Sequence, residues 1–294
     1  MISFQTRPLP AIFSPLITTF IIGLLLVACS EETAPVQTQR QNPLSSCDDS
    51  PINNTSNGNT IPTSLPYIIV SKYPHSHTAF TQGLDYRDGI LYESTGLYGQ
   101  SRLTARKLEQ SEIQHTLDIS LDSRYFAEGA TLFGNEIMQL TWKSGKVFRY
   151  RLSDFSLIEE LTIDGEGWGI THNKQHIITS NGSNTLTFRS PETLAPAHEL
   201  QVSFANRPLK KINELEWAGS CLLTNIWYND SIAVIHPDTG VTVYTIDLLK
   251  LAAAEKRINP DHVSNGIAYR DDNGHLLVTG KNWQWVYEIK LTTP

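Results

Sequence analysis

From residue 65 onward, short apolar runs alternate with polar turns rich in Gly, Asn, Asp and Ser. The stretch Phe80–Gly96 (FTQGLDYRDGILYESTG) shows the unit, a short apolar strand followed by a turn and a second apolar strand. Short runs of this kind between such turn residues predict β-strands joined in hairpins. One stretch has a helical composition, Leu248–Lys256 (LLKLAAAEK), and we expect it on the rim of a β-domain.

The same start recurs five times, which indicates a repeat protein. The five segments align on Gly83, Gly129, Gly169, Leu215 and Gly266. These anchors are 46, 40, 46 and 51 residues apart. A second strand is expected eight residues after each of the first four anchors and eleven after the fifth, near Leu91, Ile137, Ile177, Leu223 and Leu277.

Further strands follow in each unit. Third strands are predicted at Leu103–Leu108, Val147–Leu152, Leu186–Arg189, Ile232–His236 and Val286–Leu291. Fourth strands are predicted at Ile113–Ile119, Leu157–Ile163, His198–Val202 and Val241–Ile246. Four strands in each repeat predict an all-β, five-bladed β-propeller with four-stranded blades. The fifth unit lacks a fourth strand, so we expect Pro66–Ser71, before the first repeat, to supply it and close the ring. An irregular β-sandwich of the same strands is the alternative.

Residues 1–28 have the composition of an export signal. Arg7 precedes an apolar run from Ala11 to Ala28, and Leu26–Cys29 (LVAC) resembles the lipobox of bacterial lipoproteins. That resemblance implies cleavage before Cys29, acylation of its sulfur, and a lipid anchor on the periplasmic side of the bacterial cell envelope. Ser30 after the cysteine favours the outer membrane. An ordinary signal peptide or a membrane span is the alternative.

Residues 29–64 are rich in Ser, Thr, Asn, Gln and Pro, and we predict a disordered tether before a catalytic propeller domain at residues 65–294. Cys47 lies in the tether and Cys221 at a strand start. An exported protein reaches an oxidising compartment, so a disulfide and two unlinked cysteines both remain open. The net charge of −7 disfavours a nucleic-acid partner, which usually meets a basic face. We expect a monomer.

Residues with useful chemistry gather around the five anchors. The innermost strands of a propeller line its central channel, so these residues should meet at one mouth. In blade order they are Phe80, Gln82 and Glu93; Phe126, Glu128 and Trp142; Glu166, Trp168 and Asn181; Asn213, Glu214, Glu216 and Trp227; and Asn265, Lys281 and Trp283. An aromatic wall with a few polar groups is typical of a small-ligand site.

Six segments spread over the repeats carry a family resemblance. They are Phe80–Leu84 (FTQGL), Leu91–Gln100 (LYESTGLYGQ), Glu166–Thr171 (EGWGIT), Ile212–Trp217 (INELEW), Asn265–Ala268 (NGIA) and Thr279–Trp283 (TGKNW). Together they resemble the plant and bacterial type of glutaminyl-peptide cyclotransferase, over about Tyr67 to Leu291. The resemblance implies a five-bladed propeller, unrelated to the zinc-dependent animal glutaminyl cyclases. It also implies an activity, the conversion of N-terminal glutamine in peptides and proteins to pyroglutamate with loss of ammonia.

The resemblance also implies the roles of single residues. The essential glutamate of the family lies in an F-x-E-G motif, here Phe126–Gly129, and falls on Glu128. The family's pocket aromatics fall on Phe80, Phe126, Trp142, Trp168 and Trp227, and its polar catalytic groups on Gln82, Asn213 and Lys281. Ser76–His77 and Gln284 depart from the family pattern, which usually has Asp-Pro and often has Pro there. Both are turn positions, so they concern the shape of the loops.

The implied reaction joins the α-amine of the substrate to its own γ-carboxamide carbon, so it needs no covalent nucleophile, and we expect no cofactor. Glu128 would take a proton from the α-ammonium and return one to the leaving ammonia. Its aromatic neighbours Phe126 and Trp142 should raise its pKa. Lys281, Gln82 or Asn213 would stabilise the developing oxyanion. The alternative role for Glu128 is a salt bridge across the channel, for instance to Lys281.

We expect no catalytic metal. One of Glu166, Glu214 and Glu216 is a candidate ligand for a structural Ca²⁺ or other divalent cation in the channel, and polar contacts between blades are the alternative. His75 and His77 are spaced like ligands but are interpreted as surface or turn residues. Two other functions fit the sequence. One is a non-catalytic propeller that binds peptides or cell-wall fragments, and the other is a metal-dependent, lactonase-like hydrolase.

Overall fold

The computed structural model of the chain describes residues 42–47, 53–54 and 60–293. The predicted signal peptide at residues 1–28 and the predicted lipidation site Cys29 lie outside the described residues. Within the described part of the chain, no helix is long and apolar enough to cross a membrane.

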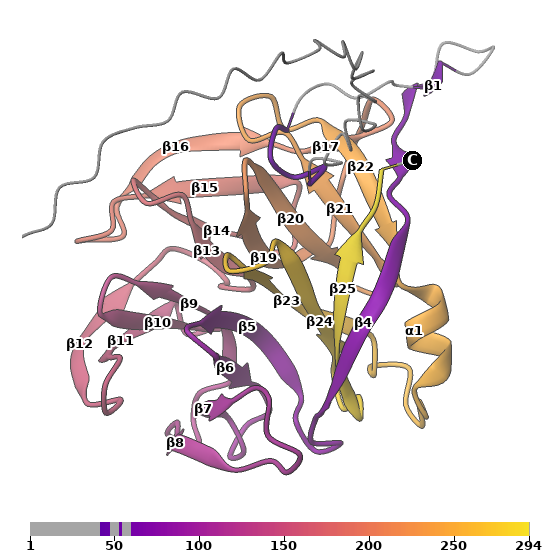
Figure 1. Cartoon of the computed structure of the whole chain (residues 1–294). Coiled ribbons are helices and arrows are strands. Elements are labelled where there is room, and N and C mark those ends of the chain that lie inside the picture. The colour runs from indigo at the N-terminus through magenta and orange to yellow at the C-terminus, as the bar shows by residue number, and fades with distance from the viewer. Residues whose placement is uncertain (1–41, 48–52, 55–59, 294) are drawn as a thin grey trace, which may run out of the picture. The chain divides into compact units, whose positions relative to one another are not determined.

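Five antiparallel sheets form the blades (Figure 1). Blade one consists of β5 (Thr81–Arg87), β6 (Ile90–Thr95), β7 (Arg102–Lys107) and β8 (His115–Ser120). Blade two consists of β9 (Ala127–Phe133), β10 (Glu136–Thr141), β11 (Lys146–Arg151) and β12 (Leu157–Thr162). Blade three consists of β13 (Ile170–His172), β14 (Ile177–Thr179), β15 (Thr185–Arg189) and β16 (Pro196–Gln201). Blade four consists of β19 (Ile212–Ala218), β20 (Cys221–Ile226), β21 (Ser231–Ile235) and β22 (Thr242–Asp247). Blade five consists of β23 (Ser264–Arg270), β24 (His275–Gly280), β25 (Trp285–Leu291) and β4 (Tyr67–Pro74).

The innermost strands β5, β9, β13, β19 and β23 contact one another in that order, and β23 contacts β5 again. The ring is therefore closed, and the prediction of an all-β, five-bladed propeller with four-stranded blades is confirmed. Apolar residues fill the spaces between adjacent blades. For example, Leu103 of blade one shares a core cluster with Leu132 and Ile137 of blade two. This packing follows from the period of two along each strand, which gives every blade two faces to bury.

The last strand to join the ring comes from the start of the domain. Strand β4 pairs antiparallel with β25, in a register that runs from Trp285 opposite Pro74 to Leu291 opposite Tyr67. The prediction that the segment before the first repeat closes the ring is confirmed, and the strand extends past the predicted Ser71. The pairing covers the outer edge of β25, which would otherwise expose unpaired backbone groups.

A few shorter elements accompany the blades. Strand β3 (Thr63–Ser64) adds in parallel to the outer edge of β22 in blade four. Two-residue pairs join β1 (Asn53–Asn54) to β2 (Thr60–Ile61) and β17 (Ser203–Phe204) to β18 (Arg207–Pro208). The predicted helix is present as α1 (Leu249–Ala254), between blades four and five.

The structure shifts the fourth repeat anchor by one residue. Leu215 pairs with Thr224 across blade four, as Leu84 pairs with Glu93 across blade one, so Leu215 matches the residue after Gly83. The position equivalent to the anchoring glycines is therefore Glu214, and the alignment on Leu215 was wrong by one residue.

The glycine anchors let neighbouring inner strands approach closely. A Cβ atom on Gly169 would lie 2.0 Å from the carbonyl oxygen of Asn213. At the fourth anchor, the Glu214 carboxylate instead accepts hydrogen bonds from Leu84 N of blade one at 3.3 Å and Ile267 N of blade five at 3.1 Å. Because blades one and four are not neighbours, this side chain crosses the central channel.

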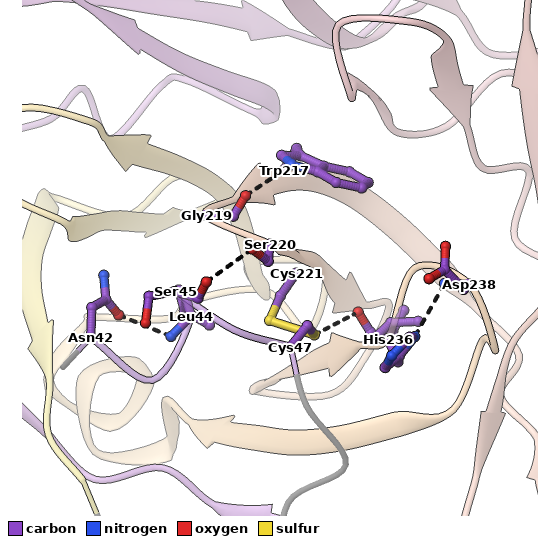
Figure 2. The surroundings of a disulfide bond; sticks show 11 residues. Asn42, Leu44, Ser45, Cys47, Trp217, Gly219, Ser220, Cys221, His236 and Asp238 are labelled. Atoms are coloured by element: carbon purple, nitrogen blue, oxygen red, sulfur yellow. Dashed lines mark hydrogen bonds between the residues drawn. A yellow bond between two sulfur atoms is a disulfide. The ribbon is translucent and has the colours of Figure 1, made fainter.

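The segment before β4 packs against blade four, as Figure 2 shows. Leu44 is fully buried, and its carbonyl accepts a hydrogen bond from Ser220 N at 2.8 Å. Cys47 forms a disulfide with Cys221, with a Cα–Cα distance of 5.1 Å. The prediction of a tether over residues 29–64 is therefore wrong for Asn42–Cys47, because Leu44 supplies an apolar side chain that the core accepts. Of the two open alternatives for the cysteines, the structure has the disulfide.

Replacement of both Cys47 and Cys221 by serine should lower the free energy of unfolding by about 2–5 kcal/mol, because the crosslink closes a long loop of the unfolded chain. The two cysteines are 174 residues apart in the sequence. Urea unfolding of the oxidised and the dithiothreitol-reduced protein measures the effect. The double serine variant is the control, and it should unfold with the reduced protein and ignore the reductant. Equal midpoints for the oxidised and reduced wild type would contradict this expectation.

Candidate active site

Glu128 lies near the start of β9, the innermost strand of blade two, and only 6% of the residue is exposed. Its backbone carbonyl accepts a hydrogen bond from the Ser94 hydroxyl, which accepts one from Gln139 Nε2 at 2.9 Å. The next residue, Gly129, donates its N–H to the carbonyl of Trp168 at 2.8 Å. The backbone that carries the carboxyl group is thus fixed from the blades on both sides.

Burial raises the pKa of the Glu128 carboxyl well above the ordinary value for glutamate. The positive charge of Lys281 opposes this shift, and the negative charge of Glu166 adds to it. The group therefore exchanges its proton at a higher pH than an exposed glutamate does. A perturbed carboxyl at a channel mouth is a candidate for acid–base chemistry.

Gln82 and Asn265 hold the Glu128 carboxyl in place. Gln82, on β5, donates from Nε2 to Glu128 Oε1 at 3.2 Å. Asn265, on β23, donates from Nδ2 to Gln82 Oε1 at 3.3 Å and to the Thr81 carbonyl at 2.9 Å. The carboxamide of Gln82 is therefore engaged on both of its ends. The sequence placed Asn265 near the mouth without a role, and the structure gives it that of fixing Gln82.

Lys281 follows β24 and is 5% exposed. Its ammonium group lies 4.8 Å from the ring centroid of Phe80. Burial lowers its pKa, although the charges of Glu128 and Asp261 oppose the shift. Among the described residues no ion pair or hydrogen bond occupies the Nζ atom, so the alternative of a salt bridge between Lys281 and Glu128 finds no support in the structure.

Asn213, on β19, is 3% exposed, and its side-chain Oδ1 is buried without a hydrogen-bond partner in the described part of the chain. Its backbone carbonyl is engaged, since it accepts a hydrogen bond from the Ser180 hydroxyl at 2.6 Å. A buried carboxamide oxygen without a partner is costly unless a ligand meets it. The Asn213 side chain is therefore available to a bound molecule.

The five aromatic residues named by the sequence form two groups of touching rings. Phe126 packs edge-on against Phe80 at 6.3 Å and Trp142 at 5.6 Å between ring centroids. Trp168 and Trp227 pack edge-on at 5.5 Å. All five are half-buried. They have the exposure expected of a pocket wall, apolar but open on one side.

One carboxylate oxygen joins the two groups. Glu166 Oε2 accepts the indole N–H of Trp142 at 2.8 Å and that of Trp168 at 2.9 Å. Two exposed tyrosines extend the wall, since Tyr98 packs against Phe126 at 5.4 Å and Tyr228 stacks on Trp227 at 4.5 Å. Sequence reasoning missed these tyrosines and the bridging role of Glu166. The LYESTGLYGQ motif contained Tyr98 and was the one signal for it.

Two glycines make room for the aromatic wall. A Cβ atom on Gly96 would lie 2.4 Å from the Phe126 ring. A Cβ atom on Gly182 would lie 2.7 Å from the Trp168 ring, and Gly182 has a positive φ of 79°. Neither ring could keep its position beside a larger residue.

Some residues that the sequence assigned to the mouth lie elsewhere. Trp283 is 1% exposed and belongs to a core cluster, and Asn181 Oδ1 accepts hydrogen bonds within an exposed turn. His75 is buried, with Nε2 2.8 Å from Glu93 Oε1, so its interpretation as a surface or turn residue was wrong. The sequence could not show that His75 is buried, because a histidine between two strands is buried only if the neighbouring blade covers it.

The three glutamates that were candidates for a channel cation have separate partners. Glu166 accepts two indole N–H groups, Glu214 accepts two backbone N–H groups, and Glu216 accepts the N–H of Tyr269 at 2.7 Å. No group of three or more His, Cys, Asp or Glu side chains in the described residues is arranged to hold a metal ion. The structure therefore assigns these carboxylates to contacts within the protein.

A cavity of about 920 Å³ opens at the opposite end of the inner strands. Asp85, Leu132, His172, Glu216 and Arg270 are among the residues that line it, and none of the nine predicted catalytic and substrate-binding residues does. The carboxylate of Asp85 accepts the N–H of Leu132 at 2.8 Å, so it links blades one and two. The site described above is preferred over this cavity because its wall is aromatic and because Asn213 Oδ1 and Lys281 Nζ have no hydrogen bond or ion pair in the described residues.

Comparisons with known proteins agree on one group of proteins. The family model described as glutamine cyclotransferase matches residues 44–291. A glutaminyl-peptide cyclotransferase of Arabidopsis thaliana is 34% identical over 229 residues, which are 76% of this chain and 70% of the plant protein. The crystal structure of Myxococcus xanthus glutaminyl cyclase superposes with a TM-score of 0.72 at 33% identity, over 79% of this chain and 100% of that one. The matched range includes every site residue from Phe80 to Lys281.

Substitution of alanine for Gly96 should displace the Phe126 ring and lower the free energy of unfolding by about 1–3 kcal/mol, as overpacking does. Near-ultraviolet circular dichroism and thermal unfolding measure the two effects. In a Phe126→Ala background the same substitution should cost little, because the clashing ring is gone. An equal cost in both backgrounds would show that Gly96 is needed for its backbone and not for this ring.

Proposed function

The chain belongs to the glutamine cyclotransferase family, and we propose that it converts the N-terminal glutamine of peptides and proteins to pyroglutamate with release of ammonia. The observation that carries this proposal is the buried Glu128 carboxyl with its raised pKa, beside an aromatic wall and two unengaged polar side chains, Asn213 and Lys281. Such a site can fold a glutamine side chain, exclude water and move a proton.

In this reaction the nitrogen of the α-amine attacks the carbon of the γ-carboxamide. A carbon–nitrogen bond forms within the ring, and the bond to the carboxamide nitrogen breaks. Glu128, ionised, takes a proton from the α-ammonium, which frees the lone pair of that nitrogen for the attack. It gives this proton to the carboxamide nitrogen, which leaves as ammonia, and the second proton that the attacking nitrogen loses as the ring closes is released to solvent. A desolvated carboxyl with a raised pKa suits both steps, and such transfer contributes typically 10²–10⁴-fold.

The contacts of the three candidate groups support a ranking for the proposed stabilisation of the oxyanion. Gln82 is hydrogen-bonded to Glu128 and Asn265, so we assign it to orienting the carboxylate. Lys281 Nζ has no hydrogen bond or ion pair among the described residues and contacts only the Phe80 ring, and Asn213 Oδ1 has no hydrogen-bond partner there. A cation in a desolvated site stabilises a developing oxyanion strongly. Lys281 is therefore the principal group, and Asn213 assists in holding the substrate.

The aromatic wall would hold the substrate folded. Trp142, Trp168 and Trp227 would enclose the methylene groups of the glutamine side chain, with Phe80 and Phe126 closing the wall beneath Lys281. Holding the amine and the carboxamide at reacting distance supplies several kcal/mol of the barrier reduction, on the order of the values known for intramolecular reactions. The rest of the peptide would leave past the exposed Tyr98 and Tyr228.

We also propose that the enzyme is a lipid-anchored monomer of the bacterial cell envelope. The lipobox-like sequence that ends at Cys29 supports an anchor, and Ser30 favours the outer membrane, on its periplasmic side. The Cys47–Cys221 disulfide supports an oxidising compartment, because such bonds persist outside the cytosol. We propose that catalysis needs no cofactor, since the two reacting groups belong to one molecule.

Glu128→Gln should fold as the wild type does and lower kcat by about 10²–10⁴-fold, because the amide cannot accept the proton. The measurement is ammonia release from a peptide that begins with glutamine, with the matching loss of mass. Glu160→Gln, on the exposed strand β12, is the matched control and should keep full activity. The wild-type rate should survive a chelator. A Glu128→Gln enzyme with wild-type turnover would remove Glu128 from the mechanism, and no ammonia from the wild type would favour a peptide-binding propeller.

The pH dependence of kcat/KM should be bell-shaped. Glu128 acts as a base only when ionised, so activity should fall as the pH drops through its raised pKa, at a pH above the ordinary glutamate value. Lys281 must be charged, and its lowered pKa places the alkaline loss below pH 10.5.

Lys281→Met should lower kcat by about 10²–10³-fold with a small change in KM, whereas Asn213→Ala should mainly raise KM. The reverse pattern would exchange their roles.

A further inference from the structure

Glu166 lies in the connection between β12 and β13, two residues before Trp168, whose indole N–H it accepts. Gly165 precedes it with a positive φ of 81°, and Gly167 follows it. The N–H of Gly167 donates to the carbonyl of Trp142 at 2.9 Å. A Cβ atom on Gly167 would lie 3.0 Å from the Thr141 carbonyl. The backbone on either side of Glu166 is therefore shaped to sit close against the end of β10, where Trp142 begins the turn.

The side chain of Glu166 ends at one oxygen that serves two rings. Oε2 accepts Trp142 Nε1 at 2.8 Å and Trp168 Nε1 at 2.9 Å. An indole has a single N–H and no acceptor, so each tryptophan has only one hydrogen bond with which to fix its ring. Both rings donate this bond to the same carboxylate, which lies in the connection between blades two and three. Hydrogen bonds to an ionised acceptor are short and strong.

We propose that Glu166 is a positioning residue for the cyclisation proposed above, which sets the orientation of Trp142 and Trp168 relative to each other and so shapes the slot for the glutamine side chain. This inference rests on the proposed function, because the slot has its meaning only if a glutamine enters it. Glu166 touches neither reacting atom and acts through the two rings.

Glu166 has a second effect, through its charge. The groups whose charges act on Glu128 are Lys281, which lowers the pKa of its carboxyl, and Glu166, which raises it. Lys143, with its ammonium group 4.0 Å from the Trp142 ring centroid, and Lys211, 5.8 Å from that of Trp227, are the cations on the wall itself. Loss of the Glu166 charge should therefore lower the pKa of Glu128 and move the acid limb of activity to lower pH.

Two variants separate the acceptor from the charge. Glu166→Gln keeps a carbonyl oxygen that can accept both indole N–H groups, but it has no charge. Glu166→Leu has a similar size but neither acceptor nor charge. Both are compared with the wild type and with the control Glu160→Gln. The assay is steady-state ammonia release from a peptide that begins with glutamine, over a range of about pH 5 to 10. Thermal unfolding and near-ultraviolet circular dichroism report folding and ring orientation.

Glu166→Leu should raise KM roughly tenfold or more, because two partly buried donors lose their acceptor and the rings turn away. Glu166→Gln should keep KM within about threefold of wild type while its acid limb moves to lower pH. A merely structural role would change thermal stability in both variants without moving the pH profile or splitting KM between them. To measure binding without turnover, both substitutions are repeated in the Glu128→Gln enzyme, and the peptide affinity is followed by tryptophan fluorescence.

The outcomes are distinct. Wild-type KM and an unmoved pH profile in Glu166→Leu would overturn the inference. The proposed function would still stand in that case if the wild type releases ammonia. Equal loss in Glu166→Gln and Glu166→Leu would also overturn it, because the acceptor would then not be what positions the rings. Absence of ammonia release from the wild type would overturn the proposed function itself. If Glu166→Leu does not fold, the comparison of Glu166→Gln with wild type still tests the inference through its pH profile and KM.

Discussion

Pairing of β4 with β25 closes the ring, and the closed ring brings together polar side chains that are far apart in the chain. Gln82 comes from blade one, Glu128 from blade two, Asn213 from blade four and Lys281 from blade five. No single blade could place a cation and an unengaged carboxamide opposite a buried carboxyl. The inner strands approach closely because glycine occupies four of the five anchors, and at the fourth anchor Glu214 spans the channel to the backbone of blades one and five.

Burial is the main cause of the shifted pKa values in the candidate active site. It raises the pKa of Glu128 and lowers that of Lys281, so each group is shifted toward its neutral form. Direct contact would cancel these shifts, but the structure keeps the two groups from forming an ion pair in the described residues. The charges of Lys281 and Glu166 act on Glu128 without direct contact, and Gln82 donates a hydrogen bond to it.

At the other end of the channel, buried acidic residues connect neighbouring blades. Asp85 and Glu216 each accept a backbone N–H from the next blade, at Leu132 and Tyr269 respectively. Those carboxylates accept hydrogen bonds from the fold, whereas Asn213 Oδ1 in the candidate active site has no partner in the described residues. The two ends of the channel therefore differ in how far the protein satisfies their hydrogen-bonding groups. This difference, rather than the size of a cavity, distinguishes the candidate active site from the opposite end.

The sequence alone determined the strands, the five repeats and the closing strand, and it singled out Glu128 as a candidate, because strand period, turn residues and a short motif are local properties of the chain. Tertiary structure decided what depends on distance across the ring. It moved the fourth anchor from Leu215 to Glu214, buried His75 against Glu93, and packed Leu44 where a tether was predicted. It also placed Gln82 in a hydrogen bond to Glu128 and joined Trp142 to Trp168 through Glu166. It left Lys281 Nζ without a hydrogen bond or ion pair among the described residues. A hydrogen bond between residues from different blades has no local pattern, since its partners meet only when the ring has closed.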